Sequence, residues 1–146
     1  MTELSHLDQN ADTTVREFFA ALELGELDEA MELVTEDILW INVSLPTIHG
    51  ERAVRRTMVL LERMKVRFAA HIHNIAQEGD VVLTERTDIF RLGPFEIRFW
   101  VCGTFELREG RIAVWRDHFS YTNVLWGGAK ALVRALTPRA RAAALA

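Results

Sequence analysis

Charged and amide side chains interrupt three segments that otherwise have the apolar composition of buried strands. The segments are residues 38–43, 83–90 and 112–119. Successive side chains of a strand point to opposite faces, so Arg86 and Asp88 should share one face of the second segment. A chain that buries this face has to pair the charges, because an isolated buried ion is costly.

The other two segments supply polar groups in the same way. Trp40 and Asn42 should share a face of the first segment, and Trp115, Asp117 and Phe119 should share a face of the third. Two carboxylates, a guanidinium and an amide could therefore meet in one pocket.

The composition is that of a globular chain with one core. Its 146 residues are 49% hydrophobic and 26% charged, which allows a sizeable core and a small cavity. The 17 Lys and Arg residues against 21 Asp and Glu give a net charge of −4 and form no long basic block. We therefore expect no nucleic-acid partner.

Cys102 is the only cysteine, which excludes an intrachain disulfide and a cysteine-built zinc site. Residues 1–10 lack the basic start and apolar run of a signal peptide. No apolar stretch approaches the roughly 18 residues of a membrane span. We expect a cytoplasmic protein without a membrane partner.

Periodicity predicts helices first and a sheet after them. Apolar residues recur at helical spacing in residues 13–24, 27–34, 51–64 and 123–136, and β-rich runs cover residues 38–43, 66–76, 81–91, 95–107 and 111–120. This order predicts a single α+β domain over residues 1–146, whose curved, mixed or antiparallel sheet packs on the N-terminal helices as a cone with an open mouth. Residues 1–11 should be frayed, and residues 138–146 form an Ala-rich tail.

Arg86 is the available cation for both carboxyl groups. One guanidinium between Asp88 and Asp117 compensates one negative charge, which favours one carboxylate and one carboxylic acid. Such a pair can activate a water on one side of a substrate and protonate a leaving oxygen on the other. Opening a strained three-membered ether requires no further catalytic group.

Longer motifs around these residues resemble those of a known family. They are Trp40-Ile-Asn42, the Leu-Pro and Gly-x-x-Ala-Val that follow it, Thr84-Glu-Arg-Thr-Asp88, Phe99-Trp-Val-Cys-Gly103, Gly110-Arg-Ile and Trp115-Arg-Asp-His-Phe119. From about residue 15 to residue 124 the chain resembles the limonene-1,2-epoxide hydrolases, and most closely their mycobacterial members. These enzymes share the cone-shaped fold of nuclear transport factor 2 and ketosteroid isomerase.

The resemblance implies a homodimeric hydrolase that adds water to a lipophilic epoxide without a metal or an organic cofactor. It implies that Asp117 is the general base on the water, that Asp88 is the general acid on the epoxide oxygen, and that Arg86 bridges the two. Asn42 would help to hold the water. Trp40 departs from the family, which usually has a tyrosine there, and an indole donates a hydrogen bond but accepts none.

Other functions stay open on the sequence alone. One is proton transfer next to a carbonyl, as in ketosteroid isomerase-like or polyketide cyclase-like enzymes, which need an oxyanion donor beside the base. Tyr121, the only tyrosine, follows the last predicted strand. Another is a noncatalytic dimer that binds a small apolar ligand. Arg86 and Asp88 taken alone could also form an exposed ion pair.

Three further features are expected to be structural. His71 and His73 share a strand face, but no third ligand at suitable spacing accompanies them, so we expect no metal site. Cys102 is expected to be an inert core residue. Glu85 and Thr87 should lie on the face opposite Asp88.

Overall fold

A six-stranded sheet forms the centre of the molecule. The structure is a computed structural model that describes residues 11–137. The strands are β1 (Val34–Asn42), β2 (Ile48–His49), β3 (Arg67–Glu78), β4 (Val81–Leu92), β5 (Phe95–Arg108) and β6 (Arg111–Phe119). Their order is β2-β1-β6-β5-β4-β3, with β1 and β6 parallel and the other neighbours antiparallel. The predicted α+β class with a mixed sheet is confirmed.

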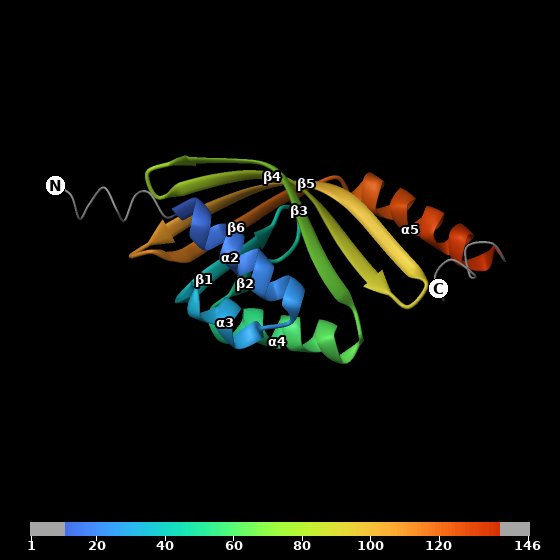
Figure 1. Cartoon of the computed structure of the whole chain (residues 1–146), viewed down its shortest axis with the longest axis horizontal. Coiled ribbons are helices and arrows are strands. Elements are labelled where there is room, and N and C mark those ends of the chain that lie inside the picture. The colour runs from blue at the N-terminus through green and yellow to red at the C-terminus, as the bar shows by residue number, and fades with distance from the viewer. Residues whose placement is uncertain (1–10, 138–146) are drawn as a thin grey trace.

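The helices lie in two places relative to the sheet. They are α2 (Ala11–Leu24), α3 (Leu27–Glu32), α4 (Glu51–Arg63) and α5 (Tyr121–Leu136). The first three gather on one side, where the strands curve around them, whereas α5 lies apart beside β5 (Figure 1). Within residues 11–137, no helix is both long enough and apolar enough to cross a membrane.

The face of the sheet that α2 covers is called the inner face below. Phe18 of α2 lies edge-on to Trp115 of β6 with 5.2 Å between ring centroids, and Phe19 lies edge-on to Phe105 of β5 at 5.6 Å. All four side chains are buried. Residues 18 and 19 can both reach the sheet because they belong to the apolar stripe of α2. The aromatic contacts exclude water from the middle of the inner face.

Pairing between β1 and β6 moves two predicted boundaries. The second helix ends at Glu32 instead of residue 34, and β1 starts at Val34 instead of residue 38. Val34 lies opposite Ile112, and the Ile112 N–H donates to the Leu33 carbonyl at 2.9 Å. This long-range pairing overrides the local helical pattern. The sequence prediction also lacks β2, and the other elements differ by at most two residues at each end.

The predictions for the two ends of the chain concern residues of which the structure describes only some. Ala11, expected to be frayed, begins α2 and is buried. The rest of the expected frayed start and the Ala-rich tail lie outside the described residues. The single domain over residues 1–146 therefore stays a prediction.

Candidate active site

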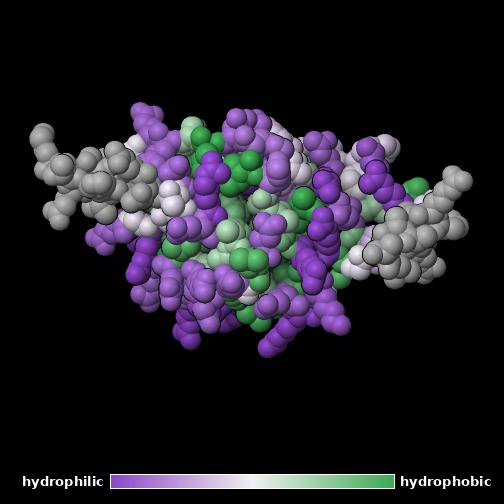
Figure 2. Space-filling view, in the orientation of Figure 1, coloured by the Kyte–Doolittle hydropathy of each residue, from purple (hydrophilic) through white to green (hydrophobic). Residues whose placement is uncertain are grey.

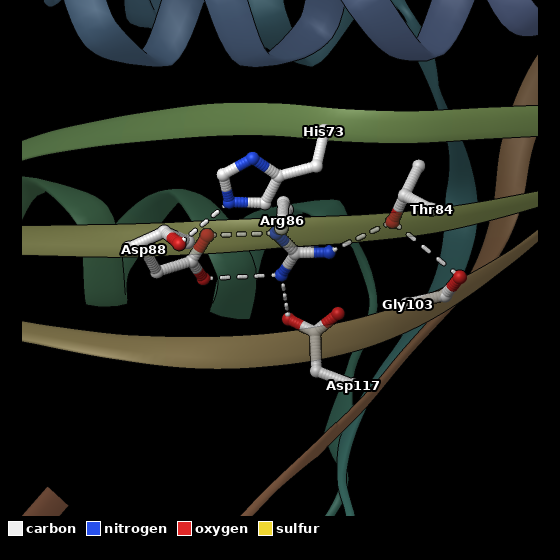
Figure 3. Close-up of polar contacts among 7 residues, drawn as sticks. His73, Thr84, Arg86, Asp88, Gly103 and Asp117 are labelled. Carbon is white, nitrogen blue, oxygen red and sulfur yellow. Dashed lines mark hydrogen bonds and ion pairs between the residues drawn. The ribbon is translucent and has the colours of Figure 1, made fainter.

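Arg86 lies at the centre of a buried polar cluster. Its side chain is fully buried, and it is the largest side chain of which this is true in the described part of the chain. Nε donates to Asp88 Oδ1 at 2.7 Å, and Nη2 donates to Asp88 Oδ2 at 3.1 Å. Nη2 also donates to Asp117 Oδ2 at 2.7 Å. The guanidinium thus connects the carboxyl group of Asp88, two residues from Arg86 in sequence, with that of Asp117, 31 residues away (Figure 3).

Strand alternation and register bring these groups together. Thr84, Arg86 and Asp88 lie on the inner face of β4, as the predicted spacing requires, and Asp117 lies on β6. The intervening strand β5 places Gly103 between Thr84 and Asp117 in the register. The Arg86 side chain therefore spans from β4 past β5 to reach Asp117.

Thr84 and Gly103 belong to this cluster, although the sequence interpretation gave them no role. Arg86 Nη1 donates to Thr84 Oγ1 at 3.3 Å, and that hydroxyl donates to the Gly103 carbonyl at 3.4 Å. Thr84 could have been found from its position two residues before Arg86 on the same face. A glycine inside a long strand is a known sign of a close approach, and this was the signal for Gly103.

An aromatic ring closes the cluster on the helix side. The Arg86 guanidinium carbon lies 4.6 Å from the centre of the Phe19 ring. The ring shields the cation from water and attracts it through its negative face. The charges of the cluster are therefore compensated by each other and by this ring, with little help from solvent.

Trp40 and Asn42 reach the cluster from β1. In the parallel pairing of β1 and β6, Trp40 lies opposite Trp115 and Asn42 lies opposite Asp117. The Trp40 and Trp115 rings are stacked, with 4.5 Å between centroids and 9° between planes. All five predicted site residues thus lie on three adjoining or nearly adjoining strands, β1, β6 and β4.

Several buried polar atoms next to Asp117 lack a hydrogen-bond partner among the described residues. They include Trp40 Nε1, Trp115 Nε1 and Asp117 Oδ1. The first two are donors, and the third is an acceptor when Asp117 is ionised. The Trp115 side chain opposes the rise in the Asp117 pKa, so its indole acts on this carboxyl without a well-formed hydrogen bond. Buried polar groups normally have partners, so Trp40 Nε1 and Asp117 Oδ1 mark a place suited to a small polar molecule.

Burial changes the proton affinity of the cluster. Burial raises the pKa of Asp88, and the attraction of the Arg86 guanidinium opposes this only in part. Burial also raises the pKa of Asp117 against the attraction of Arg86, and the nearby Asp88 carboxylate adds to the increase. For Arg86, burial lowers the pKa, but both carboxylates together raise it overall, so the guanidinium stays charged.

A cavity of about 750 Å³ lies beside the cluster, between α2, α4 and the ends of β3 and β4. Its apolar wall includes Leu22, Met58, Leu61, Phe68 and Phe90. Charged residues line another part of it, namely Glu23, Glu62, Lys65, Arg67 and Arg91. The carboxyl groups of the cluster are not part of this wall, but Phe90 follows Asp88 by two residues on the inner face, about 7 Å along the strand. Figure 2 shows apolar side chains gathered over the centre of this side and surrounded by hydrophilic ones.

The residues predicted to be structural lie on the opposite face. His73 Nε2 and Thr87 Oγ1 are 2.8 Å apart, and Asn74 donates to Glu85 at 3.3 Å. No group of three metal-ligating side chains occurs between residues 11 and 137. Cys102 is half-buried opposite Glu85, so its predicted place in the core is wrong.

Comparisons with known proteins agree with these features. The model of the limonene-1,2-epoxide hydrolase catalytic domain matches residues 9–130. Epoxide hydrolase EphG of Mycobacterium tuberculosis is 39% identical over 130 residues, which are 88% of this chain and 85% of that protein. The solved structure of an M. tuberculosis LEH-like epoxide hydrolase superposes with a TM-score of 0.81 and 38% identity, covering 90% of this chain and 98% of that one.

A more distant structure shares the fold alone. An NTF2-like protein of unknown function from Burkholderia pseudomallei superposes with a TM-score of 0.72 at 16% identity, covering 82% of this chain and 97% of that one. Fold and site together therefore define an epoxide hydrolase built on a nuclear transport factor 2-like cone. The chain belongs to the limonene-1,2-epoxide hydrolase family.

Asp117→Asn should flatten the pH dependence of stability. A carboxyl whose folded pKa is raised binds more protons folded than unfolded, so its burial destabilises the protein increasingly as pH rises from the ordinary value of 3.8 through the raised one. As pH rises above about 4, the free energy of unfolding should fall more steeply in the wild type than in Asp117→Asn, by up to about 1.4 kcal/mol per pH unit. Urea unfolding at several pH values measures both slopes.

Asp80→Asn serves as the control, because it removes an exposed carboxyl in the turn before β4. Its slope should match that of the wild type. Equal slopes for the wild type and Asp117→Asn would contradict a raised pKa at Asp117.

Proposed function

We propose that this protein hydrolyses a lipophilic epoxide to a vicinal diol in one step by general acid and base catalysis. The observation that carries the proposal is the Arg86 guanidinium held between two buried carboxyl groups, Asp88 and Asp117. A single positive charge between them favours a state with one proton on the pair. The pair then contains an acid and a base at neutral pH.

Each carboxyl group has a distinct part in the reaction. Asp117 removes a proton from water, the water oxygen bonds to an epoxide carbon, the carbon–oxygen bond of the ring breaks, and Asp88 gives its proton to the ring oxygen. The net charge of the pair is unchanged, and no covalent enzyme intermediate forms. The pair titrates as a unit, so the proton can redistribute before the next turnover.

The nucleophilic water is proposed to lie between Trp40 and Asp117. Trp40 Nε1 and Asp117 Oδ1 are buried and unpartnered within the described residues, and they lie on neighbouring strands. A water there accepts from the indole, donates to the carboxylate and keeps a lone pair for attack. Asn42, which lies opposite Asp117 in the register, would accept the second water proton with its side-chain oxygen.

The cavity supports a lipophilic substrate. A volume of about 750 Å³ is in the range of sites for drug-sized ligands. The apolar wall would hold the hydrocarbon part, and the epoxide would reach past Phe90 to Asp88. A terpene-like or lipid-derived epoxide fits this description.

The rival functions have weaker support. An isomerase needs an oxyanion donor beside the base, but Tyr121, the only tyrosine, follows β6 and donates its hydroxyl to the Val43 carbonyl. A noncatalytic pocket gives no reason to bury two carboxyl groups around one guanidinium, because apolar residues of similar size would cost less.

A homodimer and a cytoplasmic location are also proposed. Large apolar side chains are exposed along α5, namely Leu125, Trp126, Leu132, Val133 and Leu136. A contiguous apolar surface of this kind is typical of an interface, and a second copy of the chain would cover it. Cys102, a free thiol, agrees with a reducing compartment.

A single-turnover experiment in ¹⁸O-water tests the hydrolysis. Enzyme in excess over limonene oxide, cyclohexene oxide or a longer lipid epoxide should give diol that carries the solvent label, because water attacks carbon directly. Mass spectrometry of the diol measures the label. Asp88→Asn should form diol at least about 100-fold more slowly.

Two results would contradict the mechanism. Unlabelled diol in the first turnover would indicate an ester with a carboxylate of the enzyme. Absence of diol from every epoxide would favour an isomerase or a binding protein.

Trp40→Phe should reduce activity more than stability. The change keeps an aromatic ring on Trp115 but removes the only donor proposed to hold the water from that side. We expect kcat to fall about 10-fold. Steady-state kinetics and thermal unfolding measure the two effects, and equal turnover in both proteins would show that Trp40 does not hold the water.

The dimer can be tested by light scattering after size exclusion. The wild type should have twice the chain mass of 16.7 kDa. Leu125→Glu combined with Val133→Glu should halve it, because charge on the exposed side of α5 opposes association. A matched control, Arg111→Glu, changes an exposed residue at the start of β6 and should stay dimeric. A monomeric wild type would rule out the dimer.

A further inference from the structure

We propose that Thr84 and Gly103 are positioning residues for the reaction, because they fix the Arg86 guanidinium where it can contact both carboxyl groups. The inference rests on the proposed roles of Arg86, Asp88 and Asp117. It concerns two residues that touch neither the water nor the epoxide in that mechanism and act only through Arg86.

The distance across the sheet makes Gly103 necessary. Neighbouring strands lie about 4.8 Å apart, so Arg86 on β4 and Asp117 on β6 are separated by about 10 Å of sheet. Between them, β5 presents Val101, Gly103 and Phe105 to the inner face, and both large residues are fully buried. Gly103 leaves the gap through which the guanidinium passes.

A side chain at residue 103 would occupy the place of the guanidinium. A Cβ atom built on Gly103 overlaps Arg86 Nη1, and it lies 2.8 Å from Thr84 Oγ1 and 3.0 Å from Asp117 Oδ1. Three members of the cluster thus meet above one backbone position. Its conformation is ordinary, because Gly103 is absent from the residues with positive φ. The glycine is required for space and not for backbone geometry.

Thr84 fixes the remaining nitrogen of Arg86. Nε and Nη2 are bound by the carboxylates, and Nη1 donates to Thr84 Oγ1 at 3.3 Å. The single hydroxyl proton of Thr84 goes to the Gly103 carbonyl at 3.4 Å, so a lone pair of its oxygen faces Nη1. Each nitrogen of the guanidinium then has a partner, and its plane cannot turn without losing one.

Thr84→Val tests this role, because valine keeps the branched shape and removes the hydroxyl. With Nη1 released, Arg86 should hold Asp117 less firmly, and we expect kcat to fall about 10-fold with KM changed less than about 2-fold. The attraction that opposes proton binding at Asp117 would weaken, so the acidic limb of the pH–kcat profile should move to higher pH.

Two variants separate positioning from a general structural effect. Thr84→Ser retains the oxygen and should restore kcat to within about 3-fold of the wild type. Thr104→Val, one residue after Gly103 and on the opposite face, should leave kcat and the pH profile unchanged. Gly103→Ala should lose more activity than Thr84→Val, and circular dichroism would report whether it folds.

The outcomes distinguish this inference from the proposed function. Thr84→Val with wild-type kcat and pH profile would overturn the inference, as would Thr84→Ser that is as slow as Thr84→Val. Absence of diol from the wild type would overturn the proposed function instead. The ¹³C-carboxyl resonances of Asp88 and Asp117, titrated by NMR in the wild type and Thr84→Val, test the inference without turnover. Identical titrations in the two proteins would also overturn it.

Discussion

The buried pairing of Arg86 with two carboxyl groups is the interaction on which the rest of the structure depends. Two carboxyls on an inner sheet face would be untenable alone, since each desolvated charge is costly and they repel each other. The guanidinium between them compensates one of the two negative charges, and burial raises the pKa of both carboxyl groups, which favours the neutral form of the other. The packing of α2 strengthens these interactions, because Phe19 covers the cation and keeps the local dielectric low. The packing of α2 on the sheet therefore also affects the proton affinity of the two buried carboxyl groups.

The mixed topology of the sheet distributes the site over strands that are distant in sequence. β4 supplies Arg86 and Asp88, β6 supplies Asp117, and the parallel partner β1 brings Trp40 and Asn42 beside that carboxyl. A simple antiparallel meander of β3 to β6 would provide the ion cluster but leave its far side open. Strand β1, which pairs with β6, covers that side of the cluster. This explains why β1 begins before the point suggested by local pattern, since its pairing with β6 decides where it starts.

The sequence predicted the class of fold and the residues whose placement depends on a single strand. Arg86 and Asp88 follow from alternation over two residues, and Trp115 and Asp117 follow in the same way. The meeting of Asp117 with Arg86 depends on which strands are neighbours, and the family resemblance supplied that. Strand alternation indicates that Thr84 shares the face of Arg86, and a glycine inside a strand indicates a close approach at residue 103. That both residues contact Arg86 depends on the register between β4, β5 and β6, which no local pattern contains. The early start of β1 and the existence of β2 were missed for the same reason, since both are defined by a partner strand.

The absence of a side chain at residue 103 has a consequence for how this protein balances stability against activity. Glycine weakens a strand, because it loses more backbone freedom on folding and contributes no side-chain packing. Here it occupies a buried position on the inner face of β5, between two fully buried apolar residues, where a larger residue would ordinarily strengthen the core. Selection for stability alone would favour filling this position. The Arg86 cluster thus keeps a glycine in a central strand at some expense of stability, and stabilising substitutions would have to come from elsewhere in the fold.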